Sequence, residues 1–194
     1  SSPRKKTSKL PSNSGKAKAG SAKGPAFRIF GVDPGLASVG WGVIEGRSGK
    51  LVHLGHGCIS TAAADEMAAR LLFIYDELSA LIEEWRPTGA SMESLFFWRN
   101  VTSAIPVSEA KGVIRLAFVK AGVPLAEYSP TAIKQAVVGT SRAEKEQVQE
   151  MVRILLGLSA IPKPNRAADA LAAAICRSNQ GPLGALASGK SRKK

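Results

Sequence analysis

The sequence has few of the residues that build disulfide frameworks or nucleophile-based active sites. Its 194 residues include two cysteines, Cys58 and Cys176, and two histidines, His53 and His56. Two cysteines so far apart give neither a disulfide framework nor the ligand spacing of a metal cluster. The histidine pair is more typical of a surface or core position than of a ligand set. The cysteine content favours an intracellular protein, and no Ser, Cys or His nucleophile is evident.

Long apolar runs and a signal-peptide core are also lacking, so the sequence predicts no membrane-spanning segment. Both ends lack acidic residues. Residues 1–26 carry seven Lys or Arg, residues 181–194 carry four, and only +1 of the formal net charge of +12 remains for residues 27–180. We predict basic disordered tails at 1–26 and 181–194 around one domain, 27–180. The tails are either solvated chain or a non-specific attraction for a polyanion.

The stretch from Phe27 to Gly42 organises the chain. It begins as an apolar run, which is typical of a buried strand, and the run stops at Asp33. Pro34 favours an extended Asp33, and Pro34-Gly35 fits the centre of a type II turn with Gly35 at positive φ. A carboxylate beside a buried strand needs a partner, and a metal cation is one. The alternative is that Asp33 only stabilises its turn.

Hydrophobic periodicity predicts an α/β sheet with an antiparallel edge and a parallel remainder. The expected strands are about 27–33, 38–45, 50–60, 88–95 and 123–128, with a hairpin turn at 46–49. The expected helices are about 65–85, 102–121, 166–177 and two shorter ones that open at Ser129-Pro130 and at Ser141. Asp65, Ser141 and Asn165 are the predicted N-caps, and Ser141 with Glu144 has the pattern of a capping box.

Three carboxylates stand out in this arrangement. In such a sheet the first and fourth strands can be neighbours, so Asp33 and Glu93 would lie side by side. Two close carboxylates must share a proton or bind a cation, and Asp169 on the Ala-rich last helix favours the cation. Hard oxygen ligands suit Mg²⁺ or Mn²⁺. Two such ions about 3.5–4 Å apart can clamp the attacking water and the leaving oxygen of a phosphodiester.

Two further groups of residues suit a nucleic acid. Phe96 and Phe97 follow the fourth strand, where aromatic residues either pack into the core or stack on a nucleobase. Lys134, Arg142 and Lys145 surround a predicted helix start, whose amide groups favour a phosphate. The alternative for each of these basic residues is a solvated helix face.

Five segments together carry a resemblance to a known family. They are Gly31–Gly35, Met92–Phe96, Val137–Gly139, Ala143–Val148 and Ala167–Ala172. In this order and spacing they strongly resemble the RuvC family of Holliday-junction resolvases, from about Phe27 to Ser178. The resemblance implies a ribonuclease H-like fold and a homodimer that makes paired, Mg²⁺-dependent nicks across a four-way DNA junction. It also implies a bacterial, cytoplasmic, nucleoid-associated protein with a branch-migration helicase as partner.

The resemblance assigns roles to residues of this chain. Asp33, Glu93 and Asp169 match the catalytic, metal-binding acids, with two ions expected per subunit. Helix 102–121 matches the dimer-forming helix. Phe96 matches an aromatic that stacks near the junction centre, and Lys134 and Lys145 match basic residues near the cut strand. The full set of expected DNA-binding residues is Phe96, Phe97, Lys134, Arg142, Lys145 and Arg166.

One position departs from the family pattern. Arg166 stands where the family usually has a fourth metal-site residue, Asp or His, three positions before the last Asp. Arginine neither ligates a metal nor loses its proton. Arg166 shares a helix face with Asp169, so we expect it to pair with Asp169 without metal or to contact a phosphate. Metal binding should then be altered.

Two alternatives follow from the sequence. Arg166 raises the hypothesis of a noncatalytic DNA-junction binding protein that holds junctions without cutting them. The opening meander with its early Asp and Gly is also similar to that of sugar kinases and actin-like ATPases. Those proteins need further Gly-rich phosphate loops and a second domain of comparable size, for which this chain is too short.

Overall fold

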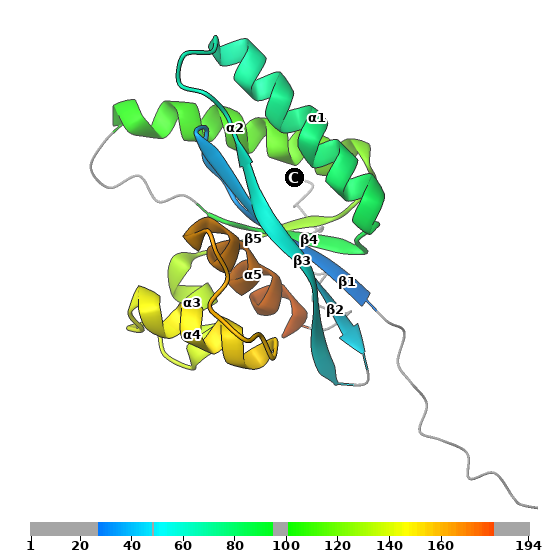
Figure 1. Cartoon of the computed structure of the whole chain (residues 1–194), viewed down its shortest axis with the longest axis vertical. Helices are drawn as coiled ribbons and strands as arrows, with labels where there is room; N and C mark the ends of the chain where they lie inside the picture. Colours follow the sequence, from blue (N-terminus) through cyan, green and yellow to red (C-terminus); the bar gives the residue numbers. More distant parts are fainter. Residues whose placement is uncertain (1–26, 48, 95–100, 181–194) are drawn as a thin grey trace, which may run out of the picture.

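The fold is built on one mixed sheet of five strands. The computed structural model describes residues 27–47, 49–94 and 101–180 (Figure 1). The strands are β1 (Phe27–Asp33), β2 (Ser38–Arg47), β3 (Lys50–Ser60), β4 (Gly89–Glu93) and β5 (Leu125–Tyr128). Their order is β3-β2-β1-β4-β5. The pairs β1–β2 and β2–β3 are antiparallel, and β1–β4 and β4–β5 are parallel. The predicted α/β sheet with an antiparallel edge is therefore confirmed. The predicted tails, Phe96 and Phe97 lie outside the described residues.

Helices cover both faces of the sheet (Figure 1). The helices α1 (Met67–Trp85) and α2 (Val101–Lys120) pack on one face. The helices α3 (Pro130–Val138), α4 (Lys145–Leu155) and α5 (Asn165–Ser178) pack on the other. Within the described part of the chain, no helix is long and apolar enough to cross a membrane.

Alternating strand residues divide the core into two layers. The layer under α1 and α2 has as its largest fully buried side chains Phe30, Val32, Val39, Val43, Ile74, Leu78, Met92, Ile114 and Phe118. The layer under α3, α4 and α5 is centred on Ile44, Leu171 and Ile175. Because successive side chains of a strand point to opposite faces, Val43 and Ile44 of β2 enter different layers.

Helix α5 lies unusually close to the two central strands. A Cβ atom at Gly31 would be 1.9 Å from the Ala170 carbonyl oxygen, and one at Gly40 would be 2.2 Å from the Arg166 carbonyl oxygen. The inner face of α5 is mostly alanine, which leaves room for this approach. The prediction that the Ala-rich helix packs closely against a neighbour is confirmed. The close approach requires small side chains on both the strands and the helix.

Two predicted N-caps are wrong because the helices begin at other residues. The Asp65 N–H closes a turn onto the Ala62 carbonyl oxygen, and α1 starts two residues later with Glu66 as its N-cap. Asn165 is already the first residue of α5. Pro164 holds the N-cap position instead, and the Asn165 Oδ1 atom accepts a hydrogen bond from Lys163 Nζ at 3.1 Å.

The predicted capping box exists one turn later than expected. Glu144, not Ser141, is the N-cap of α4, and its N–H donates to Gln147 Oε1 at 2.8 Å. The same chemistry, an acceptor at the cap and Gln or Glu three residues on, fits both registers. The start of α3 is confirmed, since Ser129 Oγ accepts from the Ala132 N–H at 3.1 Å.

The turn after β1 also differs from the prediction. Gly35 does not adopt a positive φ, so Pro34-Gly35 is not the centre of a type II turn. A Cβ at Gly35 would instead meet the Ser38 carbonyl oxygen at 2.6 Å and Arg166 Nη1 at 3.0 Å. Glycine is needed there for space rather than for φ. The predicted hairpin between β2 and β3 is confirmed.

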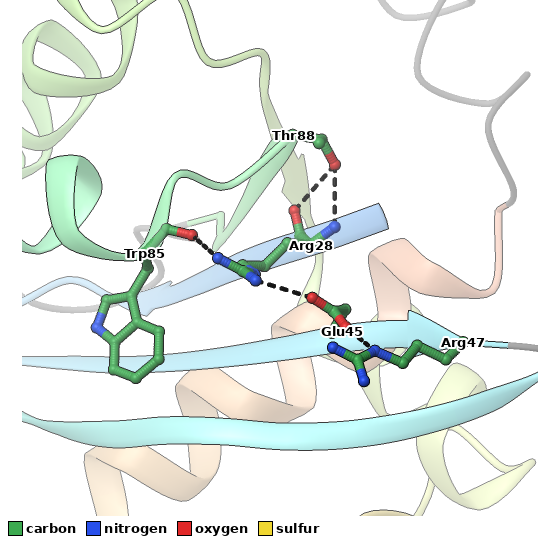
Figure 2. A network of polar contacts seen from close by, with 5 residues as sticks. All are labelled: Arg28, Glu45, Arg47, Trp85 and Thr88. Atoms are coloured by element: carbon green, nitrogen blue, oxygen red, sulfur yellow. Dashed lines mark hydrogen bonds and ion pairs between the residues drawn. The ribbon is translucent and has the colours of Figure 1, made fainter. Parts of the chain in front are cut away.

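A buried carboxylate, Glu45, lies near the hairpin end of β2 and stabilises that end of the sheet (Figure 2). Glu45 is 5% exposed and accepts from Arg28 Nη2 at 2.8 Å and from Arg47 Nε. Arg28 also donates to the Trp85 carbonyl oxygen, which ties β1 to the end of α1. The two arginines, Arg28 first, hold the pKa of Glu45 below its usual value.

We expect Glu45→Gln to lower the free energy of unfolding by about 1–3 kcal/mol at pH 7, because it leaves Arg28 without its anion. A lowered pKa in the folded state adds stability above the unfolded-state value of 4.5. The difference between the proteins should therefore shrink as the pH falls below 4.5. Urea denaturation at several pH values measures it.

Glu150→Gln is the matched control. Glu150 pairs with Arg153 on the same helix and is 46% exposed, so its loss should change stability much less than the loss of Glu45. Equal effects of the two substitutions at pH 7 would contradict a special role of the Glu45 network.

Candidate functional site

Two of the three predicted acids end adjacent parallel strands. Asp33 is the last residue of β1 and Glu93 the last residue of β4. The register pairs Val32 with Met92, so the next residues, Asp33 and Glu93, lie side by side at the same end of the sheet. In open α/β sheets ligands bind outside the carboxyl ends of the strands. The prediction that Asp33 and Glu93 are neighbours is confirmed.

The third acid reaches this edge on α5. Asp169 lies in the second turn of α5, between Ala168 and Ala170, which are both buried. The close packing of α5 on β1 and β2 sets its height above the strand ends. The charge of Asp169 acts on both Asp33 and Glu93, so the three carboxylates form one electrostatic site.

Asp33 is held by the arginine that departs from the family pattern. Arg166 Nη1 donates to Asp33 Oδ2 at 2.8 Å, with 14% of the Asp33 side chain and 44% of the Arg166 side chain exposed. The expectation that Arg166 pairs with Asp169 on its own helix is wrong. The first turn of α5 packs on Gly40 of β2, and Arg166 Nη1 lies beside Gly35, so the guanidinium reaches Asp33 instead.

Asp169 has a different cationic partner. Lys145 Nζ, from the first residue of α4, donates to Asp169 Oδ2 at 2.8 Å. The two side chains are 55% and 25% exposed. Two predicted residues, one basic and one acidic, are thus brought together from two helices, although they are 24 positions apart in the sequence.

Burial and mutual repulsion raise the pKa values of two of the acids. Burial raises the pKa of Asp33 to about 6, against the opposing effect of Arg166 and with a further increase from Asp169. The pKa of Glu93 is also raised, first by burial and then by the charges of Asp33 and Asp169. A bound cation would relieve both effects, since it favours the charged carboxylates.

A pocket of about 280 Å³ opens between the acids and the helices α3, α4 and α5. It is lined by Glu93, Lys134, Lys145, Asp169, Pro130, Ile133, Val148 and Ala172. The structure therefore brings the predicted residues Lys134 and Lys145 to two of the acids. Arg142 is exposed and does not line this pocket. Phe96 and Phe97, which follow β4, lie outside the described residues.

The donor set fits a hard divalent ion only in part. Carboxylate oxygens are the ligands that Mg²⁺ and Mn²⁺ prefer. In the conformation of the described residues, however, no three His, Cys, Asp or Glu side chains gather closely enough to hold an ion. Arg166 pairs with one oxygen of Asp33, and Lys145 pairs with one oxygen of Asp169. The role of the acids as metal ligands stays a prediction.

Sequence reasoning missed one charged residue near the site. Lys111 is 6% exposed, donates to Glu127 Oε2 at 2.7 Å, and its charge also acts on Glu93. The signal was its position in the apolar stripe of α2, directly after the buried Ala110. A lysine within such a stripe needs an anion as partner.

Comparison with known proteins agrees with this geometry. The family model of crossover junction endodeoxyribonuclease RuvC matches residues 29–177. The crossover junction endodeoxyribonuclease RuvC of Heliobacterium modesticaldum is 52% identical over 148 residues, which cover 76% of this chain and 91% of that protein. The protein of the same name from Roseiflexus sp. is 47% identical over 158 residues, 81% of this chain and 94% of that one.

Solved structures give the same result. The structure of Thermus thermophilus RuvC matches with a TM-score of 0.75 and 34% identity, over 81% of this chain and 97% of that one. T. thermophilus RuvC in complex with Holliday junction substrate matches with a TM-score of 0.74 and 31% identity, over 82% and 97% of the two chains. The fold is ribonuclease H-like, as predicted. On these matches, the chain belongs to the crossover junction endodeoxyribonuclease RuvC family.

Proposed function

We propose that the protein is a structure-selective endonuclease that resolves four-way (Holliday) DNA junctions by paired, metal-dependent nicks during recombination and repair. The observation that carries this proposal is the meeting of Asp33, Glu93 and Asp169 at the carboxyl ends of β1 and β4 in a member of this family. A relative at 31% identity has been solved with a Holliday junction substrate.

Basic side chains beside the acids support the DNA substrate. Lys134 and Lys145 line the pocket with Glu93 and Asp169, where they can pair with a phosphate next to the bond to be cut. Arg142 and Arg166 are exposed and can make further contacts with the phosphate backbone of the DNA. For Phe96 and Phe97 we propose stacking on bases near the junction centre, as the family resemblance implies.

Nucleases of this family are metal-dependent, and we propose Mg²⁺ or Mn²⁺ at this site, held by Asp33, Glu93 and Asp169. When bound, the ion activates a water and stabilises charge on the phosphodiester. The protein itself supplies orientation and charge. Asp33 and Glu93 are partly buried, and Lys145 and Arg166 balance part of the negative charge of the site. We propose two ions per subunit, as the family resemblance implies.

We also propose a homodimer formed through α2. Apolar side chains recur on the outer face of this helix: Ile105, Leu116 and Val119 are 56%, 51% and 72% exposed. Gly112 lies in the same stripe, and nothing is within 4 Å of where its Cβ would be. An exposed apolar stripe on a helix that already packs on the core suits a second copy of the chain.

Two further proposals rest on family membership and the bacterial origin of the relatives. The protein would act in the cytoplasm, on the DNA of the nucleoid. It would work with a helicase that migrates the junction, since paired cuts at a preferred position require the junction to reach that position.

Asp33→Asn should stabilise the metal-free protein at neutral pH. The raised pKa means that the native carboxyl binds more protons than the unfolded one between pH 3.8 and about 6, so wild-type stability falls as the pH rises through this range. In EDTA at pH 8 we expect the variant to be more stable by about 1–3 kcal/mol, and nearly equal at pH 4. Urea denaturation measures both.

Asp76→Asn is the control, since Asp76 is exposed on α1 and its amide should change stability by less than about 0.5 kcal/mol. Asp33→Asn would contradict the expectation by being less stable than wild type at pH 8.

The same variant tests the proposed function. With Mg²⁺ or Mn²⁺, the wild type should make symmetric nicks in a synthetic four-way junction, and Asp33→Asn should slow them by about 10²–10³-fold or more. Junction binding in a gel-shift assay should stay within a few-fold, and Asp76→Asn should cut like the wild type. Binding without nicks by the wild type would favour a protein that only holds junctions.

The dimer proposal has its own test. Val119→Glu should raise the dimer dissociation constant at least about tenfold, because it buries a charge in the proposed interface. Ile154→Glu on α4 is the control, since Ile154 is equally apolar and 54% exposed but lies away from α2. Analytical ultracentrifugation measures both, and a monomeric wild type, or equal effects of the two changes, would contradict the proposal.

A further inference from the structure

The two histidines of the chain meet on an edge strand of the sheet. His53 and His56 both belong to β3, and His53 Nε2 lies 2.7 Å from His56 Nδ1, with the ring centroids 4.9 Å apart. Both side chains are half-buried, and the chain contains no other histidine. The proposed nuclease site and the proposed dimer helix make no use of this pair.

A β-bulge brings the two rings together. In a regular strand, residues three positions apart point to opposite faces of the sheet. The register pairs His53 with Ile44 and His56 with Gly42, so β3 has one more residue than β2 between the paired positions. Both histidines therefore point to the face on which Ile44 lies, the one covered by α3, α4 and α5. Bulges of this kind re-aim side chains and are frequent beside functional sites.

The hydrogen bond between the rings is close to a chelating geometry. Neutral imidazole nitrogens are common metal ligands, and here two of them face each other. Zn–N bonds of about 2.0–2.1 Å place two ligand nitrogens about 2.9–3.4 Å apart. The observed separation of 2.7 Å must therefore widen by less than about 0.7 Å, which a small rotation of the rings about χ2 achieves.

Both facing nitrogens can be unprotonated at the same time. The hydrogen bond holds one proton between them, and the donor ring can move this proton to its other nitrogen. Burial, and then the charge of His56, hold the pKa of His53 below its usual value, which favours a neutral ring near pH 7. Among the described residues no third His, Cys, Asp or Glu joins the pair, so water fills the other positions of an ion.

We propose that His53 and His56 form a metal site of their own, which binds an ion of the nickel, copper and zinc group and clamps the bulge of β3. Imidazole suits these ions, whereas carboxylates suit Mg²⁺ and Mn²⁺. Because β2 lies between β3 and β1, the pair is two strand spacings, about 10 Å, from the strand that carries Asp33. The site is separate from the acids and does not depend on the proposed function.

Nuclear magnetic resonance of the histidine rings tests the site directly, because the chain has only these two histidines. The full chain is titrated with Zn²⁺ in an excess of Mg²⁺, which competes for the acids. We expect the ring nitrogen resonances of His53 and His56 to shift together. The midpoint of thermal denaturation should also rise, since an ion that binds the native state stabilises it.

His53→Gln and His56→Gln should each weaken Zn²⁺ binding at least about tenfold, because loss of a hydrogen-bond partner of a ligand alone costs about 10–100-fold. Val52→Gln is the matched control, since it places the same side chain on β3 at a position that is 39% exposed and keeps both imidazoles. It should bind Zn²⁺ like the wild type. Rings that do not shift in excess Zn²⁺, a shift of one ring alone, or equal weakening by Val52→Gln would overturn the proposal.

Discussion

The close contact of α5 with β1 and β2 is the constraint on which the site depends. Gly31 and Gly40 leave room for the α5 backbone, and the alanines of α5 leave room for the strands. A side chain at either glycine would push the helix away and lift Asp169 and Arg166 from the strand ends. The geometry of the acids is therefore decided by residues that have no chemistry of their own.

The clustered acids lower the stability of the fold, and nearby positive charges limit this loss of stability. Three acids share one partly buried edge, which raises the pKa values of Asp33 and Glu93. Arg166 and Lys145 offset part of that cost by pairing with two of the acids. The Glu45 network at the far end of β2 is the reverse case, since there two arginines hold the charge of one buried acid. One end of the sheet is stabilised by its charges, and the other gathers like charges that oppose folding.

The sequence predicted the antiparallel edge and parallel remainder of the sheet, the meeting of Asp33 with Glu93, and the close-packed last helix. Hydrophobic periodicity marks the strands and helices, their order along the chain indicates the sheet type, and the alanine content of the last helix indicates its close packing. It did not predict which cation meets which acid. Helical spacing pointed from Arg166 to Asp169, but the seating of the α5 N-terminus on Gly40 turns the guanidinium toward Asp33. The helix caps failed for a similar reason, since Ser141 and Glu144 both suit a capping box and only the packed structure selects one.

The ion pair between Arg166 and Asp33 joins residues 133 positions apart. During synthesis β1 emerges early, and Asp33 must wait for nearly the whole domain before its partner helix is made. A partly translated chain therefore has no assembled acid cluster, whatever metal is present. The acid cluster can therefore assemble only after the last helix of the domain, α5, has been made.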